Sequence, residues 1–182
     1  MDTPTTAAVP TPTTAPLPLD ARTVADALRL ADFARDCFGR DYPSALRAVQ
    51  VAQWALESGE GVHDCGGARN YFGLKARDAP GPGGAHDRMV FAPTTEHLAG
   101  ADVRTRANFR HFDTAAACFV AHARLLCYVD AYAPARAHAT DPIAFAGALQ
   151  GVYASDPHYS VKLVAQLRAL GLVPPVAPAA GA

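Results

Sequence analysis

The segment from Ser44 to Gly61 constrains the fold more than any other part of the chain. Its apolar residues recur at helical spacing, so the pattern predicts an amphipathic helix that ends at Glu57 or Ser58, before Gly59. One face carries a stripe that is apolar apart from two glutamines: Leu46, Val49, Gln50, Gln53 and Trp54. A stripe of this kind needs a core to pack against, so the segment predicts a packed, largely helical domain.

Glu57 continues this stripe into the last helical turn. We therefore expect its carboxyl group to be partly desolvated and to lie near unpaired carbonyl groups that carry partial negative charge. Both effects raise the pKa of a carboxyl group, as a general acid requires. Taken alone, the helix favours a simpler interpretation, in which an ordinary solvated glutamate precedes a terminating glycine.

Composition narrows the class of protein. The chain has 182 residues, of which 50% are hydrophobic, and a formal net charge of -1. These values predict one globular domain and argue against nucleic-acid binding through bulk charge. No apolar run is long enough to cross a bilayer, and the N-terminus lacks the basic start and apolar stretch of a secretory signal peptide. The cluster His63-Asp64-Cys65 lacks metal-ligand spacing, so we predict no metal and no cofactor.

The remaining elements predict a mainly α fold with a small β-hairpin lobe. Apolar and polar residues alternate on both sides of a turn signal, which predicts a hairpin with arms at 88–98 and 102–112. We expect Asp20 or Thr23, Ser44, Asp113 or Thr114, Asp141 and Asp156 to cap the five helices. Predicted domain boundaries are a flexible Pro/Thr/Ala-rich extension over 1–20, a single domain over 21–172 and a loose tail over 173–182.

Two further segments are candidates for a site that includes Glu57. The loop Asn70-Tyr71-Phe72-Gly73-Leu74-Lys75-Ala76 combines aromatic rings, an amide and a lysine, which suits the binding of sugars. The first hairpin arm carries a second carboxylate, Glu96, although a charged residue near a hairpin tip is ordinary in itself.

Five motifs occur in an order that resembles glycoside hydrolase family 73, the endo-β-N-acetylglucosaminidases, and the flagellum-associated peptidoglycan hydrolase domain in particular. The motifs are Ala55-Leu56-Glu57-Ser58-Gly59, Asn70-Tyr71-Phe72-Gly73-Leu74-Lys75-Ala76, Thr94-Thr95-Glu96, Ala107-Asn108-Phe109-Arg110-His111-Phe112 and Tyr153-Ala154-Ser155-Asp156-Pro157-His158-Tyr159. The resemblance covers about residues 44 to 170. One departure is Glu60, which stands where family members commonly carry an aromatic residue.

The resemblance implies a lysozyme-like two-lobed fold and cleavage of the GlcNAc-β-1,4-MurNAc bond of peptidoglycan. It implies catalytic roles for Glu57 as acid, for Glu96 and for Tyr153, although a tyrosine before a helix cap is equally often a packing residue. Either Glu96 activates water or the acetamide group of the substrate attacks, and the sequence leaves both routes open. Candidate substrate-binding residues are Asn70, Tyr71, Phe72, Lys75, Thr95, Asp156 and Tyr159.

The alternatives are a lysozyme-like muramidase or lytic transglycosylase, and a cell-wall-binding module without catalysis. Under all of these readings the partner is the glycan strand of peptidoglycan and the place of action is the cell wall, in the periplasm or outside the cell. Without a signal peptide of the usual kind, we expect another export route or release at lysis. The lack of an export signal and of a separate wall-binding repeat fits a phage-type lysis enzyme or an enzyme that accompanies a flagellar or secretion apparatus, and we expect a monomer.

Overall fold

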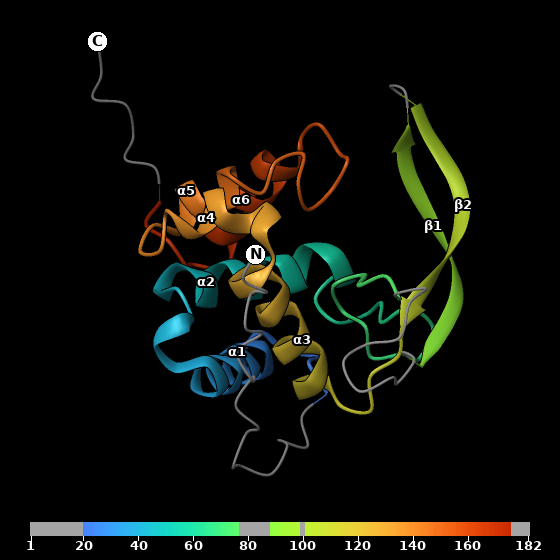
Figure 1. The fold of residues 1–182 in the computed structure, drawn as a ribbon, viewed down its shortest axis with the longest axis horizontal. Helices are drawn as coiled ribbons and strands as arrows, with labels where there is room; N and C mark the ends of the chain where they lie inside the picture. The colour runs from blue at the N-terminus through green and yellow to red at the C-terminus, as the bar shows by residue number, and fades with distance from the viewer. Residues whose placement is uncertain (1–19, 77–87, 99–100, 176–182) are drawn as a thin grey trace, which may run out of the picture.

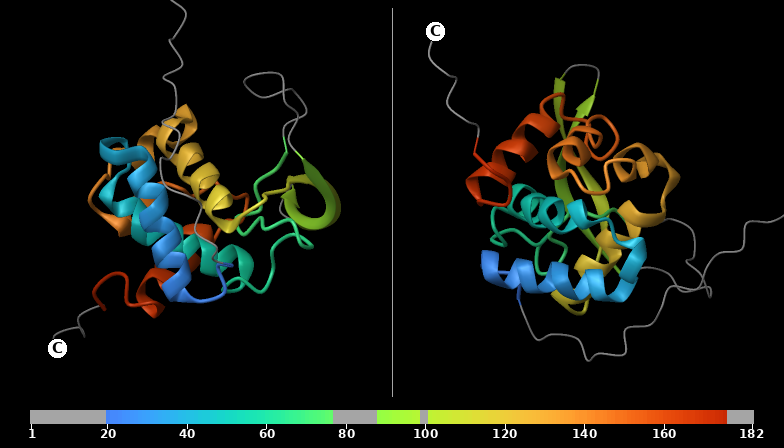
Figure 2. Two further views of the ribbon diagram at one scale, coloured as in Figure 1. Left: turned by 90° about the horizontal axis from the view of Figure 1, so that it is seen from below. Right: turned by 90° about the vertical axis from the view of Figure 1, so that its left-hand side faces the viewer.

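The computed structural model describes residues 20–76, 88–98 and 101–175. It is a body of helices beside a two-stranded antiparallel hairpin (Figures 1 and 2). The elements in chain order are α1 (Val24–Phe38), the 3-10 turn η1 (Gly39–Asp41), α2 (Ser44–Ser58), β1 (Met89–Leu98), β2 (Ala101–Arg110), α3 (Ala115–Tyr128), the 3-10 turn η2 (Asp130–Tyr132), α4 (Ala133–Arg136), α5 (Pro142–Gly147) and α6 (Tyr159–Ala169).

The central element of the helical body is α2, which contacts α1, α3, α5 and α6. The predicted stripe is its buried face, where Leu46, Val49 and Trp54 have no exposed surface. Gln50 and Gln53 are equally buried, as their place in the stripe predicts. Buried amide groups need hydrogen-bond partners, so we expect both glutamines to form hydrogen bonds with other groups inside the core.

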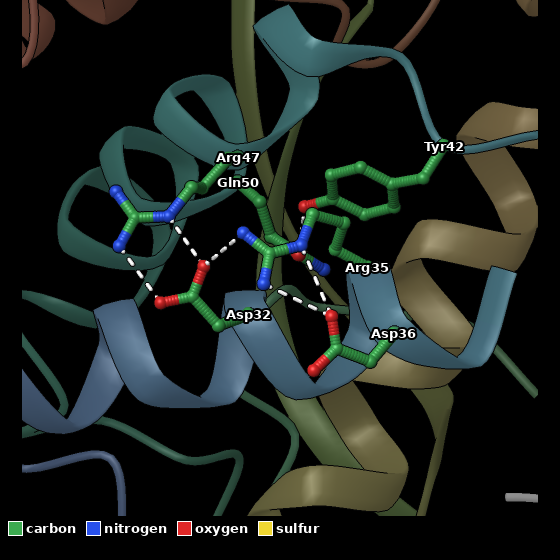
Figure 3. A network of polar contacts seen from close by, with 6 residues as sticks. All are labelled: Asp32, Arg35, Asp36, Tyr42, Arg47 and Gln50. Carbon is green, nitrogen blue, oxygen red and sulfur yellow. Dashed lines mark hydrogen bonds and ion pairs between the residues drawn. The ribbon is translucent and has the colours of Figure 1, made fainter. Parts of the chain in front are cut away.

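An ion pair holds α2 against α1 (Figure 3). The Arg47 guanidinium donates to both carboxylate oxygens of Asp32, at 2.6 and 2.8 Å. Arg35 adds a third contact to Asp32 at 2.8 Å. The hydrogen bonds from Arg47 lower the pKa of the Asp32 carboxyl, so the pair stays ionised at neutral pH. The planar guanidinium suits this two-pronged contact in a way that a lysine ammonium does not.

The hairpin forms a lobe that is joined to the body at one end. Its register pairs Met89 with Arg110 and Leu98 with Ala101. The junction with the loop after α2 is made by Arg110 N–H, which donates to the carbonyl of Leu74 at 2.9 Å, and by Ala76 N–H, which donates to the carbonyl of Asn108 at 2.8 Å. Phe109 of β2 is buried at this junction.

The predicted fold class is confirmed, and the hairpin arms agree with the prediction to within two residues. Thr23, Thr114 and Asp141 cap α1, α3 and α5 with their side chains. Two predicted caps are wrong. Ser44 is the first helical residue of α2 and donates its hydroxyl to the carbonyl of Ala139 instead. Asp156 does not cap α6, because the helix begins at Tyr159 and Asp156 accepts from the backbone N–H of His158.

The four cysteines are free thiols, and three of them are buried. None of the helices in the described part of the chain is long and apolar enough to cross a membrane. In the same described ranges, no three His, Cys, Asp or Glu side chains are grouped as metal ligands would be.

A buried histidine completes the core between α2 and α3. His122 has no exposed surface and stacks on Phe72, with ring centroids 3.9 Å apart and planes inclined by 13°. The Gln50 amide donates to the carbonyl of Phe119 at 2.7 Å and lies 3.2 Å from His122 Nδ1. Since the amide is a donor there, Nδ1 accepts, and Nε2 carries the proton of the neutral ring without a partner among the described residues. Burial lowers the pKa of His122 to about 3.

We expect His122 to make the fold less stable in acid. The folded state keeps the ring neutral down to about pH 3, whereas the unfolded chain protonates it near pH 6.5. The contribution of neutral His122 to the free energy of unfolding is therefore fully present above about pH 6.5. It is lost as the pH falls towards 3, by about 1.4 kcal/mol per pH unit. Urea unfolding at several pH values should show this slope in the native protein, and His122→Leu should lack it. Equal slopes in the two proteins would contradict the assignment.

Candidate active site

The end of α2, which carries Glu57, is fixed by hydrogen bonds of the residues that follow it. Gly59 takes a left-handed conformation (φ 57°) and ends the helix through a hydrogen bond from its N–H to the carbonyl of Ala55. The Ser58 hydroxyl donates to the carbonyl of Trp54 at 2.5 Å and accepts from Gly61 N–H at 2.8 Å. The side chain of Glu57 is thus carried by a rigid turn of helix.

The carboxyl group of Glu57 faces a cleft of about 450 Å³. The cleft is lined by residues from the end of α2, the loop before the hairpin, both strands, the segment before α6 and α6 itself: Glu57, Phe72, Gly73, Lys75, Thr94, Thr95, Phe109, Tyr153, Ala154, Ser155, Asp156 and Lys162. These segments come together from distant parts of the sequence. The helical body therefore forms one wall of the cleft and the hairpin lobe the other.

The environment of Glu57 shifts its titration in the direction that the sequence predicts. Burial raises the pKa of the Glu57 carboxyl, and the hydrogen bond from the Tyr159 hydroxyl, at 2.8 Å, partly offsets that rise. The side chain is nevertheless exposed on its cleft side. The desolvation thus comes from protein atoms packed around and behind the carboxyl group, while its open side can meet a ligand.

Tyr153 lies beside Glu57, with its hydroxyl engaged by the loop. It donates to the carbonyl of Phe72 at 3.0 Å, and its ring stacks on Tyr159 with centroids 5.6 Å apart. Burial, together with the nearby Glu57 charge, raises the pKa of Tyr153 well above its ordinary value. The phenol is therefore neutral, it shapes the wall of the cleft, and it holds the aromatic loop in place.

The predicted substrate-binding residues fall into two groups. Phe72, Lys75, Thr95 and Asp156 line the cleft. Tyr159 is buried and reaches the cleft only through its contact with Glu57. Asp156 pairs with Lys162 at 2.5 Å, and both are in the wall.

Asn70 and Tyr71 are not among the residues that line the cleft. The Asn70 amide is buried and donates to the carbonyls of Leu74 and Arg110, at 2.8 and 2.9 Å, while its oxygen accepts from Leu74 N–H at 2.9 Å. These bonds tie the aromatic loop to β2. Tyr71 is also buried, and burial raises its pKa to about 12. Asn70 thus has a structural role in the loop, and Tyr71 packs in the hydrophobic core.

Glu96 lies in β1, with its backbone opposite Val103. Its side chain falls outside the part of the structure that is described, so its catalytic role stays a prediction. Glu60 is exposed, has a left-handed backbone (φ 56°), and is not part of the cleft wall. The charge that Glu60 introduces therefore lies outside the cleft.

Sequence reasoning missed Gln53, Phe109 and Lys162. Phe109 and Lys162 line the cleft, and the Gln53 amide donates to the Tyr159 hydroxyl at 2.8 Å. A polar residue on an otherwise apolar helix stripe was the available signal for Gln53, because a buried amide needs a partner. No sequence pattern indicated Lys162. It is exposed on α6, and the turn that precedes α6 places it at the cleft.

Comparison with known proteins decides the family. A family model described as glucosaminidase, mannosyl-glycoprotein endo-beta-N-acetylglucosaminidase, matches residues 42–172, which is well over half of the chain. The chain belongs to the glucosaminidase family. It is therefore a glycoside hydrolase, as the order of its motifs predicts.

Solved structures of this glucosaminidase's relatives share its fold. A peptidoglycan hydrolase mutant from Sphingomonas sp. A1 is 30% identical over 80% of this chain and 96% of that chain, with a TM-score of 0.59. The truncated glycoside hydrolase domain of Salmonella typhimurium FlgJ is 26% identical over 86% and 100% of the two chains, with a TM-score of 0.60. The catalytic domain of the Listeria monocytogenes autolysin Auto is 25% identical over 88% and 89%, with a TM-score of 0.62. Comparison with curated protein sequences found no match.

Proposed function

We propose that this glucosaminidase hydrolyses the GlcNAc-β-1,4-MurNAc bond of peptidoglycan, with Glu57 as the general acid. The observation that carries the proposal is a carboxyl group with a raised pKa, open on one side to a cleft between two lobes. A raised pKa keeps the proton available at a pH where most glutamates have lost it. Relatives described as peptidoglycan hydrolases and as an autolysin support the choice of polymer.

The charges of the cleft suit a wall polymer. The chain has only two lysines, Lys75 and Lys162, and both line the cleft. Peptidoglycan carries carboxylates on its muramic acid and on its peptide stems, so ammonium groups that line the cleft favour such a strand over a neutral polysaccharide. Of the two, Lys162 is also paired with Asp156. Phe72 also reaches the cleft, although its ring is buried against His122 and Phe119.

Two routes complete the reaction after Glu57 protonates the glycosidic oxygen. In the first, Glu96 acts as a base on water and the anomeric configuration is inverted. In the second, the 2-acetamido oxygen of the substrate, positioned by Tyr153, displaces the leaving sugar and forms an oxazoline, which water then opens, so configuration is retained. The first route is supported by Thr94 and Thr95, which line the cleft next to Glu96 in sequence. The second is supported by the position of Tyr153 beside Glu57. NMR of the newly formed anomer distinguishes inversion from retention.

The test of the function is the sugar at the new reducing end. Purified peptidoglycan digested with the protein should yield fragments that end in GlcNAc, identified by mass spectrometry after borohydride reduction. MurNAc at that end would identify a muramidase, and anhydro-MurNAc a lytic transglycosylase, and either would overturn the proposal. Binding to sacculi without any release of reducing ends would identify a wall-binding module instead.

The setting of the activity follows from the polymer. We propose that the protein acts at the cell wall, and that its partners in the cell belong to a flagellar, secretion or phage lysis apparatus. The resemblance of the motifs to the flagellum-associated domain supports the first of these, and the genes that adjoin its own would distinguish them.

A further inference from the structure

Three side chains form a hydrogen-bonded chain behind the open face of Glu57. Gln53 and Glu57 are four residues apart on α2 and so share one side of the helix. The first residue of α6, Tyr159, places its hydroxyl between them. The Gln53 amide donates to the Tyr159 oxygen at 2.8 Å, and the Tyr159 hydroxyl donates to Glu57 Oε1 at 2.8 Å.

The direction of this chain follows from the number of protons. A phenol has one proton, so it can donate one hydrogen bond. The amide of Gln53 fills an acceptor position of the phenol oxygen, which leaves the single proton for Glu57. If the amide were turned over, its oxygen would compete for that proton. In the orientation found, Gln53 Oε1 has no partner among the described residues. Gln53 thus donates its N–H to the Tyr159 oxygen although its own Oε1 stays without a partner among these residues, and the tyrosine proton is directed to Glu57.

The consequence for Glu57 is that its two oxygens are not equivalent. Oε1 accepts the hydrogen bond from the Tyr159 hydroxyl when the carboxyl group is ionised. When the group is protonated, Oε1 is the carbonyl oxygen and accepts the same hydrogen bond. The acidic proton then belongs on Oε2. We infer that Gln53, acting through Tyr159, is a positioning residue that holds Oε1 as an acceptor and leaves Oε2 to deliver the proton to the glycosidic oxygen. The catalytic part of this inference rests on the proposed function.

The other ionisable groups around Glu57 do not obscure its titration. Burial raises the pKa of Tyr153, Tyr159 and Cys65, the last to about 11. The hydrogen bond from Lys162 lowers the pKa of Asp156. Lys75 and Lys162 bring positive charge to the same cleft from the loop and from α6. His158, whose backbone N–H donates to Asp156, also lies beside the cleft, so the titration of Glu57 has to be followed on its own carboxyl signal.

The composition of the chain makes a direct test practical. The sequence contains three glutamates, Glu57, Glu60 and Glu96. Labelling glutamate with ¹³C at the side-chain carboxyl gives three signals, and the one missing from Glu57→Gln identifies Glu57. Its titration is followed in the full-length native protein, Tyr159→Phe, Gln53→Met and the double variant. Gln50→Met is the matched control, because Gln50 is equally buried on α2 but bonds to Tyr42, Phe119 and His122.

The inference makes a specific prediction about additivity. Tyr159→Phe removes a hydrogen bond that favours the carboxylate, so the Glu57 midpoint should rise by about one pH unit. Gln53→Met should shift it in the same direction by less, and the double variant should match Tyr159→Phe alone, since Gln53 acts through the tyrosine. Gln50→Met should leave the midpoint unchanged. An unchanged midpoint in Tyr159→Phe, or additive shifts in the double variant, would overturn the inference.

Kinetics separate this inference from the proposed function. With peptidoglycan as substrate, the alkaline limb of the kcat profile should move with the NMR midpoint, and kcat should fall about tenfold in Tyr159→Phe with KM unchanged. A general loss of packing would change the stability and leave the limb in place. If the native protein releases no reducing ends, the proposed function fails, while the NMR midpoints still decide whether Gln53 and Tyr159 control the carboxyl group.

Discussion

Glu57→Gln should reduce the release of reducing ends from purified peptidoglycan by about a thousandfold. The amide has nearly the same shape as the carboxyl group, so it keeps the acceptor for Tyr159 and leaves the end of α2 in place. It has no proton to give to the leaving sugar oxygen, and this loss is the physical reason for the effect. The measurement is the initial rate of reducing-end formation at the pH optimum of the native protein.

Glu60→Gln is the matched control for this experiment. Glu60 follows three residues later, is exposed and is not part of the cleft wall. Its neutralisation changes the net charge by the same amount and should leave the rate within about twofold. Substantial activity in Glu57→Gln, with an unchanged fold judged by the fluorescence of the single tryptophan, would remove Glu57 as the acid.

Gly61→Ala should destabilise the protein by about 3 kcal/mol or more. The backbone at Gly61 has φ 85°, which strains any residue with a Cβ atom, and that atom would lie 2.0 Å from the carbonyl oxygen of Ala21. The same oxygen accepts the indole N–H of Trp54 at 3.0 Å. Because the neighbour is backbone, it cannot turn aside as a flexible side chain can. The free energy of unfolding in urea gives the measurement.

Gly66→Ala separates strain from collision. Gly66 also has a positive φ, 73°, but a Cβ atom there would meet nothing within 4 Å. We expect it to cost about 1 kcal/mol, from the left-handed backbone alone. A loss in Gly61→Ala no greater than that in Gly66→Ala would show that the segment around Ala21 moves away without cost.

Local patterns predicted most of the secondary structure because the chemistry that stops and starts helices is local. Thr23, Thr114 and Asp141 cap helices with hydroxyl or carboxylate groups that reach an N–H two or three residues ahead. Ser44 has the same chemistry, but its hydroxyl bonds to the carbonyl of Ala139, 95 residues away. Asp156 lies three residues before α6 begins and accepts from the backbone N–H of His158 and from the Lys162 ammonium. In both cases a tertiary contact or a tighter turn competed with the local cap and prevailed.

The candidate site could be predicted less completely. The position of Glu57 at a helix end and the cleft positions of Phe72 and Lys75 agree with the motifs in which they occur. Asn70 lies in the same motif, yet its amide is used by the backbone of Leu74 and Arg110. A short motif specifies which residue types recur together, but it does not say which of them face a ligand and which hold the loop.

By itself, the sequence determined that a helix stripe would be buried, that a hairpin would stand beside the helical body, and that a carboxyl group would end the stripe. These features depend on the spacing of neighbouring residues and on turn chemistry. Only the tertiary structure decided that Tyr159, 102 residues after Glu57, donates to one of its oxygens, and that Gln53 sets the direction of that bond. Contacts of this kind arise from the packing of α6 against α2, and that packing depends on the shape of the whole core.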